Sequence, residues 1–177
     1  MSPLIEQIIY GFYVGDLGEM IIAQSDLGLC WLGFVQEGGD RAGSFAQLKA
    51  RFPEAALMQS DAVADNLGRR LVRAWQDGRE RAVEVDLRGT DFQVEVWNAL
   101  RDVGRGYVCS YSEVADMVMR PKAVRAVGRA VACNPVSVIV PCHRVVQKSG
   151  RIGQYAWGED LKRSLLIAEG VAETLLQ

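Results

Sequence analysis

Cys142 and His143 lie next to each other in the stretch PVSVIVPCHRVV, directly after Pro141, and His143 is the only histidine in the 177-residue sequence. A cysteine attacks as its thiolate, and because a free thiol has a pKa of roughly 8.5, it needs a neighbouring base or cation near neutral pH. Adjacent side chains point to opposite faces of an extended segment, but on a tight turn they need not. The pair therefore predicts a nucleophilic cysteine assisted by His143, directly or through a water. The alternative is a histidine without a catalytic role, whose ring nitrogens are hydrogen-bonded in the core or at the surface.

The other three cysteines, Cys30, Cys109 and Cys133, form no C-x-x-C pair with one another or with Cys142. This spacing argues against a zinc ribbon and against a thioredoxin-type motif, so no metal site is expected. Disulfides are not expected in a reducing compartment either. The three residues are predicted to be small buried hydrophobes.

The character of the sequence changes near residue 88, where the helices expected to position this chemistry begin to follow one another. Thr90 with Gln93, and Ser110 with Glu113, have the three-residue spacing of capping boxes and predict two helix N-termini. Pro121 suits the first position of the next helix, PKAVRAVGRAVA. Two short helices joined by a tight turn make a helix-turn-helix candidate.

The second of these helices combines positive charge with small side chains. Its basic residues are spaced three and four apart and would share one face: Lys122, Arg125 and Arg129. Small residues such as Ala126 and Gly128 would allow close approach to a partner. A helix of this kind in the second position of a helix-turn-helix predicts nucleic-acid recognition. The alternative is an ordinary structural helix pair.

The charge distribution points the same way. Residues 1–100 carry 9 Lys/Arg against 15 Asp/Glu, whereas residues 101–163 carry 11 Lys/Arg against 5 Asp/Glu, although the whole chain has a net charge of only −2. A basic segment within an acidic protein can attract a polyanion to one face. The alternative is a solvated surface with no charged partner.

The N-terminal part predicts an α/β arrangement. Residues 8–35 are apolar runs broken by the turn signals GDLG and SDLG, which predict an antiparallel meander. Residues 44–52 and 60–77 are expected to be helical, and RAVEVDL at 81–87 is expected to be a short strand. No run of about 18 apolar residues exists, and the start has no signal-peptide pattern. These features favour a cytoplasmic protein without a membrane partner.

The motif PCHRV resembles the active-site signature of the DNA repair methyltransferases that act on O6-alkylguanine. Five blocks in all are similar to that family and follow its order: RGTDFQVEVW (88–97), SYSEVA (110–115), RPKAVRAVG (120–128), NPVSVIVPCHRVV (134–146) and GQYAWG (153–158). The resemblance implies two domains. Residues 1–85 would form a ribonuclease-H-like α/β domain with a small antiparallel sheet. Residues 86–177 would form a mostly helical domain with a winged helix-turn-helix-like motif.

The same resemblance implies a suicidal alkyl transfer without a cofactor. The thiolate of Cys142 would displace guanine from the alkyl carbon on O6 and keep the alkyl group as a thioether, once per molecule. O4-alkylthymine would be a second substrate. His143 would deprotonate Cys142 through a water and would be oriented by Glu169. Asn134 would hold the turn before the active-site segment, and Tyr111 would donate a hydrogen bond or proton to guanine N3.

The resemblance also implies how the protein would bind damaged double-stranded DNA. In the absence of DNA the protein would be a monomer. The second helix would lie in the minor groove, with the damaged nucleotide flipped out and Arg125 filling the vacated space. Ala126 and Gly128 would be small enough to let the helix backbone approach the groove, while Lys122 and Arg129 would add positive charge for DNA binding. The pocket for the flipped base would be formed by Val145, Gly153, Tyr155, Ala156 and Trp157. Trp157 is expected either to narrow the slot for the O6 substituent or to pack in the core.

Two features qualify this interpretation. Met119 occupies a turn position where the family often has a glycine, which affects the expected shape of the loop. Two other functions also fit Cys142 and the basic helix. One is a cysteine hydrolase that turns over many times, and the other is a DNA-binding module that flags lesions or regulates transcription with an unreactive cysteine.

Overall fold

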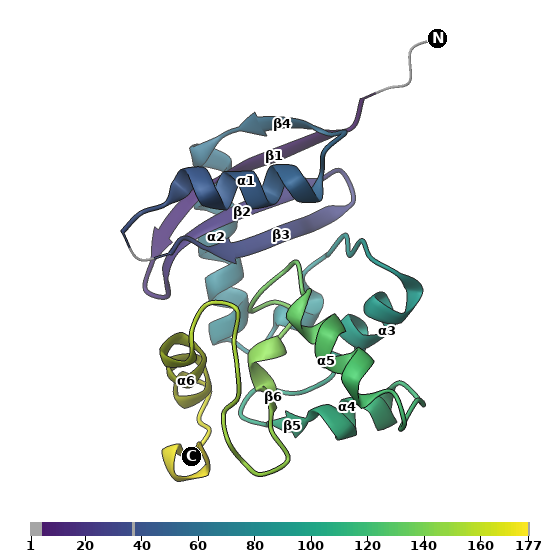
Figure 1. The fold of residues 1–177 in the computed structure, drawn as a ribbon. Coiled ribbons are helices and arrows are strands. Elements are labelled where there is room, and N and C mark those ends of the chain that lie inside the picture. Colours follow the sequence, from purple (N-terminus) through teal and green to yellow (C-terminus); the bar gives the residue numbers. More distant parts are fainter. Residues whose placement is uncertain (1–4, 37, 177) are drawn as a thin grey trace.

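The N-terminal half of the protein is a four-stranded sheet covered by two helices (Figure 1). The computed structural model describes residues 5–36 and 38–176. The strands are β1 (Gln7–Gly15), β2 (Gly18–Ser25), β3 (Gly28–Phe34) and β4 (Ala56–Gln59), in the spatial order β3-β2-β1-β4. The antiparallel meander β1-β2-β3 confirms the prediction, and its two turns end at Gly18 and Gly28, which both have positive φ. Strand β4 pairs parallel to β1 and was not predicted.

The two helices pack on opposite faces of this sheet. Helix α1 (Arg41–Arg51) and helix α2 (Asp61–Gln76) begin and end close to the predicted ranges. Because successive strand residues face opposite ways, Ile21 of β2 packs in the cluster that contains α1, whereas Met20 and Ile22 pack in the cluster that contains α2. Gly68 lets α2 approach the sheet, since a Cβ at this position would collide with the ring of Tyr13.

The prediction of a strand at 81–87 was wrong. The chain there forms a short 3₁₀ helix, η1 (Glu80–Ala82), followed by irregular backbone with one isolated bridge between Val85 and Leu29. The side chain of Arg101 donates hydrogen bonds from Nη2 to the carbonyls of Arg81 and Val83, at 2.9 and 2.7 Å. A long-range side chain therefore satisfies backbone groups that a strand would have paired.

The C-terminal half is largely helical (Figure 1). Its elements are α3 (Asp91–Leu100), β5 (Cys109–Ser110), α4 (Tyr111–Met117), α5 (Val124–Ala132), η2 (Cys142–Arg144), β6 (Val145–Val146), α6 (Glu159–Ala168) and η3 (Glu173–Leu175). The two short strands β5 and β6 pair in parallel. The predicted arrangement of an α/β N-terminal part and a helical C-terminal part is therefore confirmed.

Both predicted capping boxes are present, but α5 begins later than expected. Thr90 and Ser110 each accept from the third residue of their helix, and the Gln93 and Glu113 side chains bond back to the cap. Helix α5 starts at Val124 and not at Pro121, because a turn closed by the Ala123 N–H to the Arg120 carbonyl, at 2.8 Å, precedes it.

The late start changes the expected basic face. Lys122 lies in the turn, so it does not share a helix face with Arg125 and Arg129 as predicted. Met119, in the turn that follows α4, has a φ of 57°. This left-handed conformation favours glycine, which fits the glycine that the family often has at this position.

The two halves share one hydrophobic core. It joins the lower face of the sheet and α2 to residues such as Val96, Trp97 and Leu165 of the C-terminal half. The outer edge of β3 is also paired. The Leu32 N–H donates to the Pro135 carbonyl and the Leu32 carbonyl accepts from the Ser137 N–H, each at 3.0 Å. The segment that leads to Cys142 is therefore anchored on the N-terminal sheet.

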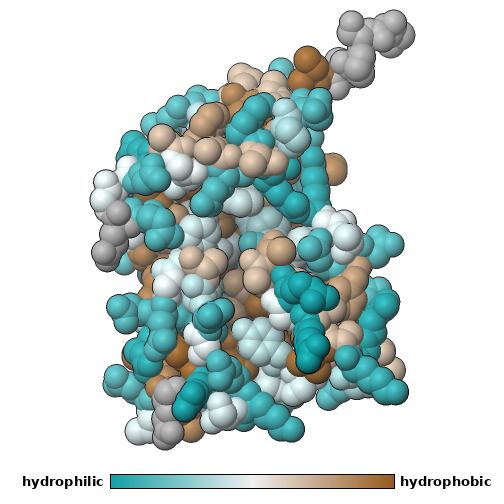
Figure 2. Space-filling model, in the orientation of Figure 1, coloured by the Kyte–Doolittle hydropathy of each residue, from teal (hydrophilic) through white to brown (hydrophobic). Residues whose placement is uncertain are grey.

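The surface seen in Figure 2 is mostly hydrophilic, and hydrophobic residues appear as small separate patches. Among the described residues, no helix is long and apolar enough to cross a bilayer. Within the same ranges, no group of three or more His, Cys, Asp or Glu side chains is arranged to hold a metal ion.

Candidate active site

Cys142 is presented by consecutive tight turns. Val138 has a φ of 70°, and around it the Ile139 N–H donates to the Ser137 carbonyl at 2.8 Å, which closes a γ-turn. Pro141, with φ −82° and ψ 62°, forms an inverse γ-turn closed by the Cys142 N–H and the Val140 carbonyl at 2.8 Å. The 3₁₀ helix η2 then begins at Cys142. Cys142 and His143 therefore lie on a turn, where their side chains are not forced to opposite faces.

Asn134 holds both the turn and the thiol. Its side-chain oxygen accepts from the Val136 N–H at 2.9 Å, and its Nδ2 donates to the Val140 carbonyl at 2.8 Å and to Cys142 Sγ at 3.0 Å. Burial raises the pKa of the Cys142 thiol, while the hydrogen bond from Asn134 and the charge of Lys162 act in the opposite direction. The hydrogen bond from Asn134 and the charge of Lys162 thus stabilise the thiolate, but a base is still needed to remove the thiol proton.

His143 is paired with Glu169 at the end of α6. His143 Nε2 lies 2.7 Å from Glu169 Oε1, and both side chains are fully buried. Burial raises the pKa of Glu169, but hydrogen bonds from His143 and Arg144 outweigh it and lower the pKa to about 2. Because the carboxylate is ionised, Nε2 carries the proton of the neutral imidazole and Nδ1 is the basic nitrogen. Nδ1 is buried and has no hydrogen-bond partner among the described residues.

Arg144 is a buried member of the site that the sequence did not reveal as such. It is 1% exposed and donates from Nε to Glu169 Oε2 at 2.9 Å and from Nη2 to Glu169 Oε1 at 3.0 Å. It also forms an ion pair with Glu80 of η1 and donates to the Val103 carbonyl at 2.5 Å. A buried charge needs such partners, but in the sequence Glu80 resembles any surface acid.

Lys162 was also missed, although helix periodicity could have found it. It is 1% exposed, and its Nζ donates to the carbonyls of Val145 at 2.6 Å and Gln154 at 3.3 Å. Burial lowers its pKa to about 8. Lys162 in α6 and Glu169 at its C-cap are seven residues apart with Leu165 and Leu166 between them, a spacing that puts all four on the buried face.

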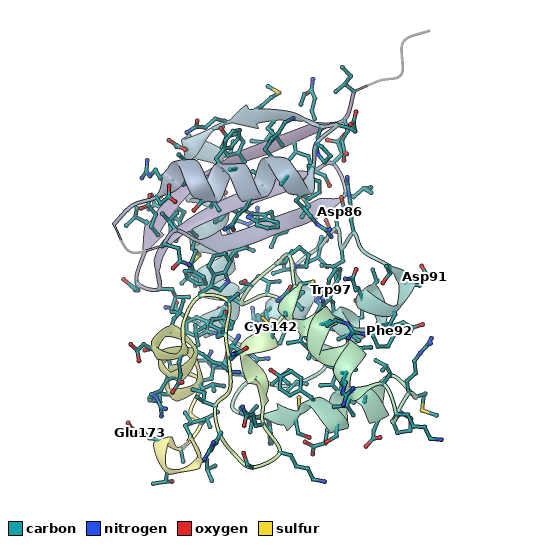
Figure 3. All side chains as sticks on the ribbon, viewed as in Figure 1. Asp86, Asp91, Phe92, Trp97, Cys142 and Glu173 are labelled. Atoms are coloured by element: carbon teal, nitrogen blue, oxygen red, sulfur yellow. The ribbon has the colours of Figure 1, made fainter. Side chains whose placement is uncertain are left out.

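A cavity of about 1270 Å³ opens beside Cys142 and is lined by residues of both halves of the protein. Figure 3 labels Cys142 in the helical half, on the side that faces the N-terminal sheet. Most of the predicted pocket and turn residues line it: Tyr111, Gly128, Asn134, Gly153, Tyr155, Ala156 and Trp157. Val145, also expected in the pocket, is fully buried in β6 and is not among the residues that line this cavity. Cys133 also differs from the prediction, since it is exposed and lines the cavity. The N-terminal half contributes Trp31, Gln47 and Arg51 to the wall.

Trp157 packs against the sheet and also faces the cavity. Its ring lies on β3, where a Cβ at Gly33 would come within 2.9 Å, and its centroid is 6.0 Å from that of Phe34. Its Nε1 donates to Ser137 Oγ at 2.8 Å. The same side chain lines the cavity that Cys142 borders, so both roles expected for it remain compatible with its position.

The basic residues of the helix-turn-helix remain available to a ligand. Arg125 and Arg129 on α5, and Lys122 in the preceding turn, are exposed. None of the three takes part in a salt bridge within residues 5–36 and 38–176. Tyr111 begins α4 in the cavity wall, where burial raises the pKa of its hydroxyl.

Comparison with known proteins places this geometry in a family. The model of the 6-O-methylguanine DNA methyltransferase DNA-binding domain matches residues 91–171. The methylated-DNA–protein-cysteine methyltransferase of Methanosarcina acetivorans is 32% identical over 163 residues, which cover 91% of this chain and 97% of that protein. The chain belongs to the methylated-DNA–protein-cysteine methyltransferase family. The resemblance noted in the sequence is thereby confirmed.

Other members of the methyltransferase family extend the likeness to the whole fold. The bifunctional transcriptional activator/DNA repair enzyme Ada of Escherichia coli is 36% identical over 159 residues, or 89% of this chain and 44% of Ada. The chain thus spans about half the length of this relative. The crystal structure of the Mycobacterium tuberculosis OGT in complex with DNA superposes with a TM-score of 0.71, at 32% identity over 95% of this chain and 94% of that one.

Proposed function

We propose that this protein repairs DNA by direct reversal, transferring the alkyl group from O6 of guanine in double-stranded DNA to Cys142 once per molecule. The observation that carries the proposal is the arrangement around the thiol. Cys142 borders a cavity, Asn134 donates to its Sγ, and the next residue in the chain, His143, forms a buried pair with Glu169. Family membership supports the same activity.

The proposed reaction starts with removal of the thiol proton. Nδ1 of His143 accepts this proton through a bridging water, and the ionised Glu169 stabilises the resulting imidazolium. The thiolate then attacks the alkyl carbon in line with the bond to O6. The C–S bond forms while the C–O bond breaks, and its electron pair goes to guanine, which re-forms its carbonyl. Tyr111 offsets the charge on the leaving base by donating toward N3, and the proton taken from the thiol balances the one that guanine gains.

Access to O6 requires the damaged nucleotide to leave the helix. A stacked base cannot reach a thiol inside a cavity, and extrusion has a free-energy cost of a few kcal/mol. We propose that α5 enters the minor groove and that Arg125 fills the space left in the stack. Arg129 and Lys122 would contact the backbone, and Ala126 and Gly128 would let the helix approach. The DNA complex of the Mycobacterium tuberculosis relative supports DNA as the partner.

Several finer features belong to this proposal. O4-alkylthymine is a second substrate, no cofactor takes part, and the protein acts as a cytoplasmic monomer until it meets DNA. Residues 1–85 and 86–177 act as a supporting domain and an alkyl-acceptor domain. Gly153, Tyr155, Ala156 and Trp157 surround the extruded base, which the cavity wall supports.

The deciding experiment is intact mass spectrometry after mixing with duplex DNA that contains O6-methylguanine. We expect a single gain equal to one CH2 unit and peptide mapping of the methyl group to Cys142. Cys142→Ser should abolish the gain and leave DNA affinity nearly unchanged. Cys133→Ser is the matched control, because Cys133 lines the same cavity and is the more exposed thiol; this variant should react like the wild type.

Three outcomes would contradict the proposal. A methyl group on Cys133 would move the acceptor to another thiol of the same cavity. Repeated turnover without a stable adduct would favour a cysteine hydrolase. Tight binding to the lesion with no mass gain would favour a DNA-binding module with an unreactive cysteine.

A further inference from the structure

The carboxylate that orients His143 has a third donor, which comes from the N-terminal half. Trp75 lies at the end of α2 and donates from Nε1 to Glu169 Oε1 at 2.7 Å. Trp75 is 3% exposed, and 94 positions separate it from Glu169. The acceptor is the same oxygen that lies 2.7 Å from His143 Nε2. The indole N–H and the imidazole therefore share one carboxylate oxygen.

Trp75 is held in place by Arg105 of the C-terminal half. Arg105 donates from Nη1 to the Trp75 carbonyl at 2.8 Å and from Nη2 to the Ala168 carbonyl at 2.6 Å. Its Cζ lies 5.0 Å from the Trp75 ring centroid, within the range of a cation–π contact. Arg105 thus links the end of α2 to the residue that precedes Glu169. The approach of Trp75 to the carboxylate is fixed by three contacts that do not involve His143.

The contribution of Trp75 differs from that of Arg144. Arg144 binds both oxygens of Glu169 and so determines how the carboxylate is oriented. Trp75 adds a neutral donor at Oε1 alone. A hydrogen bond to a carboxylate oxygen draws negative charge toward the donor, so less charge remains to support a second donor at the same atom. The N–H of Trp75 therefore weakens the hydrogen bond that Glu169 Oε1 accepts from the Nε2–H of His143.

We propose that Trp75 is a positioning residue of the alkyl-acceptor site, whose indole N–H holds Glu169 Oε1 beside His143 and moderates the basicity of the imidazole. The N-terminal half then takes part in the chemistry through α2 and is more than a support for the fold. The role in alkyl transfer rests on the proposed function, whereas the contact between Trp75, Glu169 and His143 does not.

The other charged groups around His143 stay in place when Trp75 is changed. Arg144 and Lys162 disfavour the imidazolium, Glu169 favours it, and Glu80 and Arg105 act at longer range through Arg144 and Trp75. The uncharged thiol of Cys142 completes the surroundings. Removal of one neutral N–H therefore isolates its effect on Oε1. The expected direction is a stronger hydrogen bond from His143 Nε2 and a higher pKa of His143.

The test compares Trp75→Phe with Trp97→Phe. Trp97 is the matched control, because it is also buried in the shared core and donates from Nε1, but to the Ala130 carbonyl at 2.8 Å. His143 is the only histidine, so its imidazole signals in NMR need no further assignment. In Trp75→Phe we expect the Nε2–H proton to move downfield at neutral pH and the proton affinity of His143 to rise by about three-fold or more. In Trp97→Phe neither should change.

A functional readout accompanies the spectra. The pH profile for alkylation of Cys142 by iodoacetamide should move to lower pH in Trp75→Phe and stay in place in Trp97→Phe, because a stronger base forms the thiolate earlier. An unchanged or upfield Nε2–H signal in Trp75→Phe, or equal changes in the two variants, would overturn the proposal. Neither measurement uses DNA, so failure of the repair proposal alone would leave both results intact.

A reciprocal measurement covers the case in which Trp75→Phe does not fold. In Glu169→Gln the indole N–H signal of Trp75 should move upfield, because a neutral amide replaces a charged acceptor. The indole N–H of Trp97 should not move. A stationary Trp75 signal in this variant would overturn the proposal as well.

Discussion

The thiol of Cys142 is buried, and burial raises its pKa. Free thiolate is therefore scarce at neutral pH, and in the proposed reaction a base must remove the proton. The nitrogen of His143 that is free to do so is Nδ1, because Nε2 is engaged by Glu169.

Removal of either member of the pair should shift the pH dependence of alkyl transfer upward. In His143→Phe or Glu169→Gln the thiolate would form mainly by its own ionisation, so the single-turnover rate at neutral pH should fall by about 10²–10⁴-fold and recover as the pH rises. Rates measured across neutral and alkaline pH check this. Glu173→Gln is the control, because Glu173 is an exposed acid close to Glu169. Unchanged profiles in both site variants would remove the relay from the mechanism.

The width of the slot beside Cys142 should depend on Trp157. If its indole crowds the O6 substituent, overpacking of about 1–3 kcal/mol would slow bulky groups roughly ten- to hundred-fold. Trp157→Gly should then accelerate reaction with O6-benzylguanine far more than with O6-methylguanine DNA. Trp157→Phe, which keeps a ring against Gly33 and Phe34, should retain most of the selectivity. Fast reaction of the wild type with O6-benzylguanine would show that the indole serves the core alone.

At the scale of elements, α5 and the turn that precedes it present a short basic surface. Helix α5 is limited to Val124–Ala132, so Arg125 lies in its first turn, while Arg129 lies near its end. Lys122 in the turn adds charge before the helix begins. Small residues separate the arginines, which leaves the backbone accessible to a groove.

Arg125→Ala should slow repair in duplex DNA by about ten-fold or more, since extrusion of the base has a free-energy cost of a few kcal/mol that the side chain would help to offset. Reaction with the free alkylated base should be almost unchanged. Arg129→Ala removes the same charge from the same helix and should weaken binding with a smaller salt dependence but little change in the rate at saturation. Equal slowing of Arg125→Ala on duplex and free base would be incompatible with the wedge role.

At the scale of the whole molecule, the buried ion network joins the two halves. Arg144 of η2 and Glu169 of α6 are linked to Glu80 of η1 and to α2 through Trp75. These contacts are embedded in the core that the sheet shares with the helical half. Protonation of the network should therefore weaken the entire fold.

The free energy of unfolding should decrease as the pH falls. Burial lowers the pKa of His143 below 6.5, and the pKa of Glu169 is lowered from 4.5 to about 2. Both groups bind protons more tightly when unfolded, so stability is lost as the pH falls below about 6.5 for His143 and between about 4.5 and 2 for Glu169. Urea unfolding at several pH values checks this. Glu169→Gln should lose about 3–5 kcal/mol at neutral pH and depend less on pH below 4.5. Glu95→Gln, in an exposed pair with Arg120, should change little.

The sequence by itself determined features that depend on near neighbours. The capping boxes at Thr90 and Ser110 and the turns at Gly18 and Gly28 were predicted because each involves residues at most three positions apart. The adjacency of Cys142 and His143, and the family that the motif around them indicates, could be recognised in the sequence for the same reason.

Only the tertiary structure decided which charged and polar groups are buried and where they are paired. The contacts of Glu169 with Trp75 and of Arg144 with Glu80 join positions 94 and 64 residues apart, and nothing in the local sequence indicates which residue is the partner of which. Val145, which was expected in the pocket, is fully buried in β6, which pairs with β5. A buried charge is stable only with its partners in place, and those partners are brought together by the packing of the whole chain.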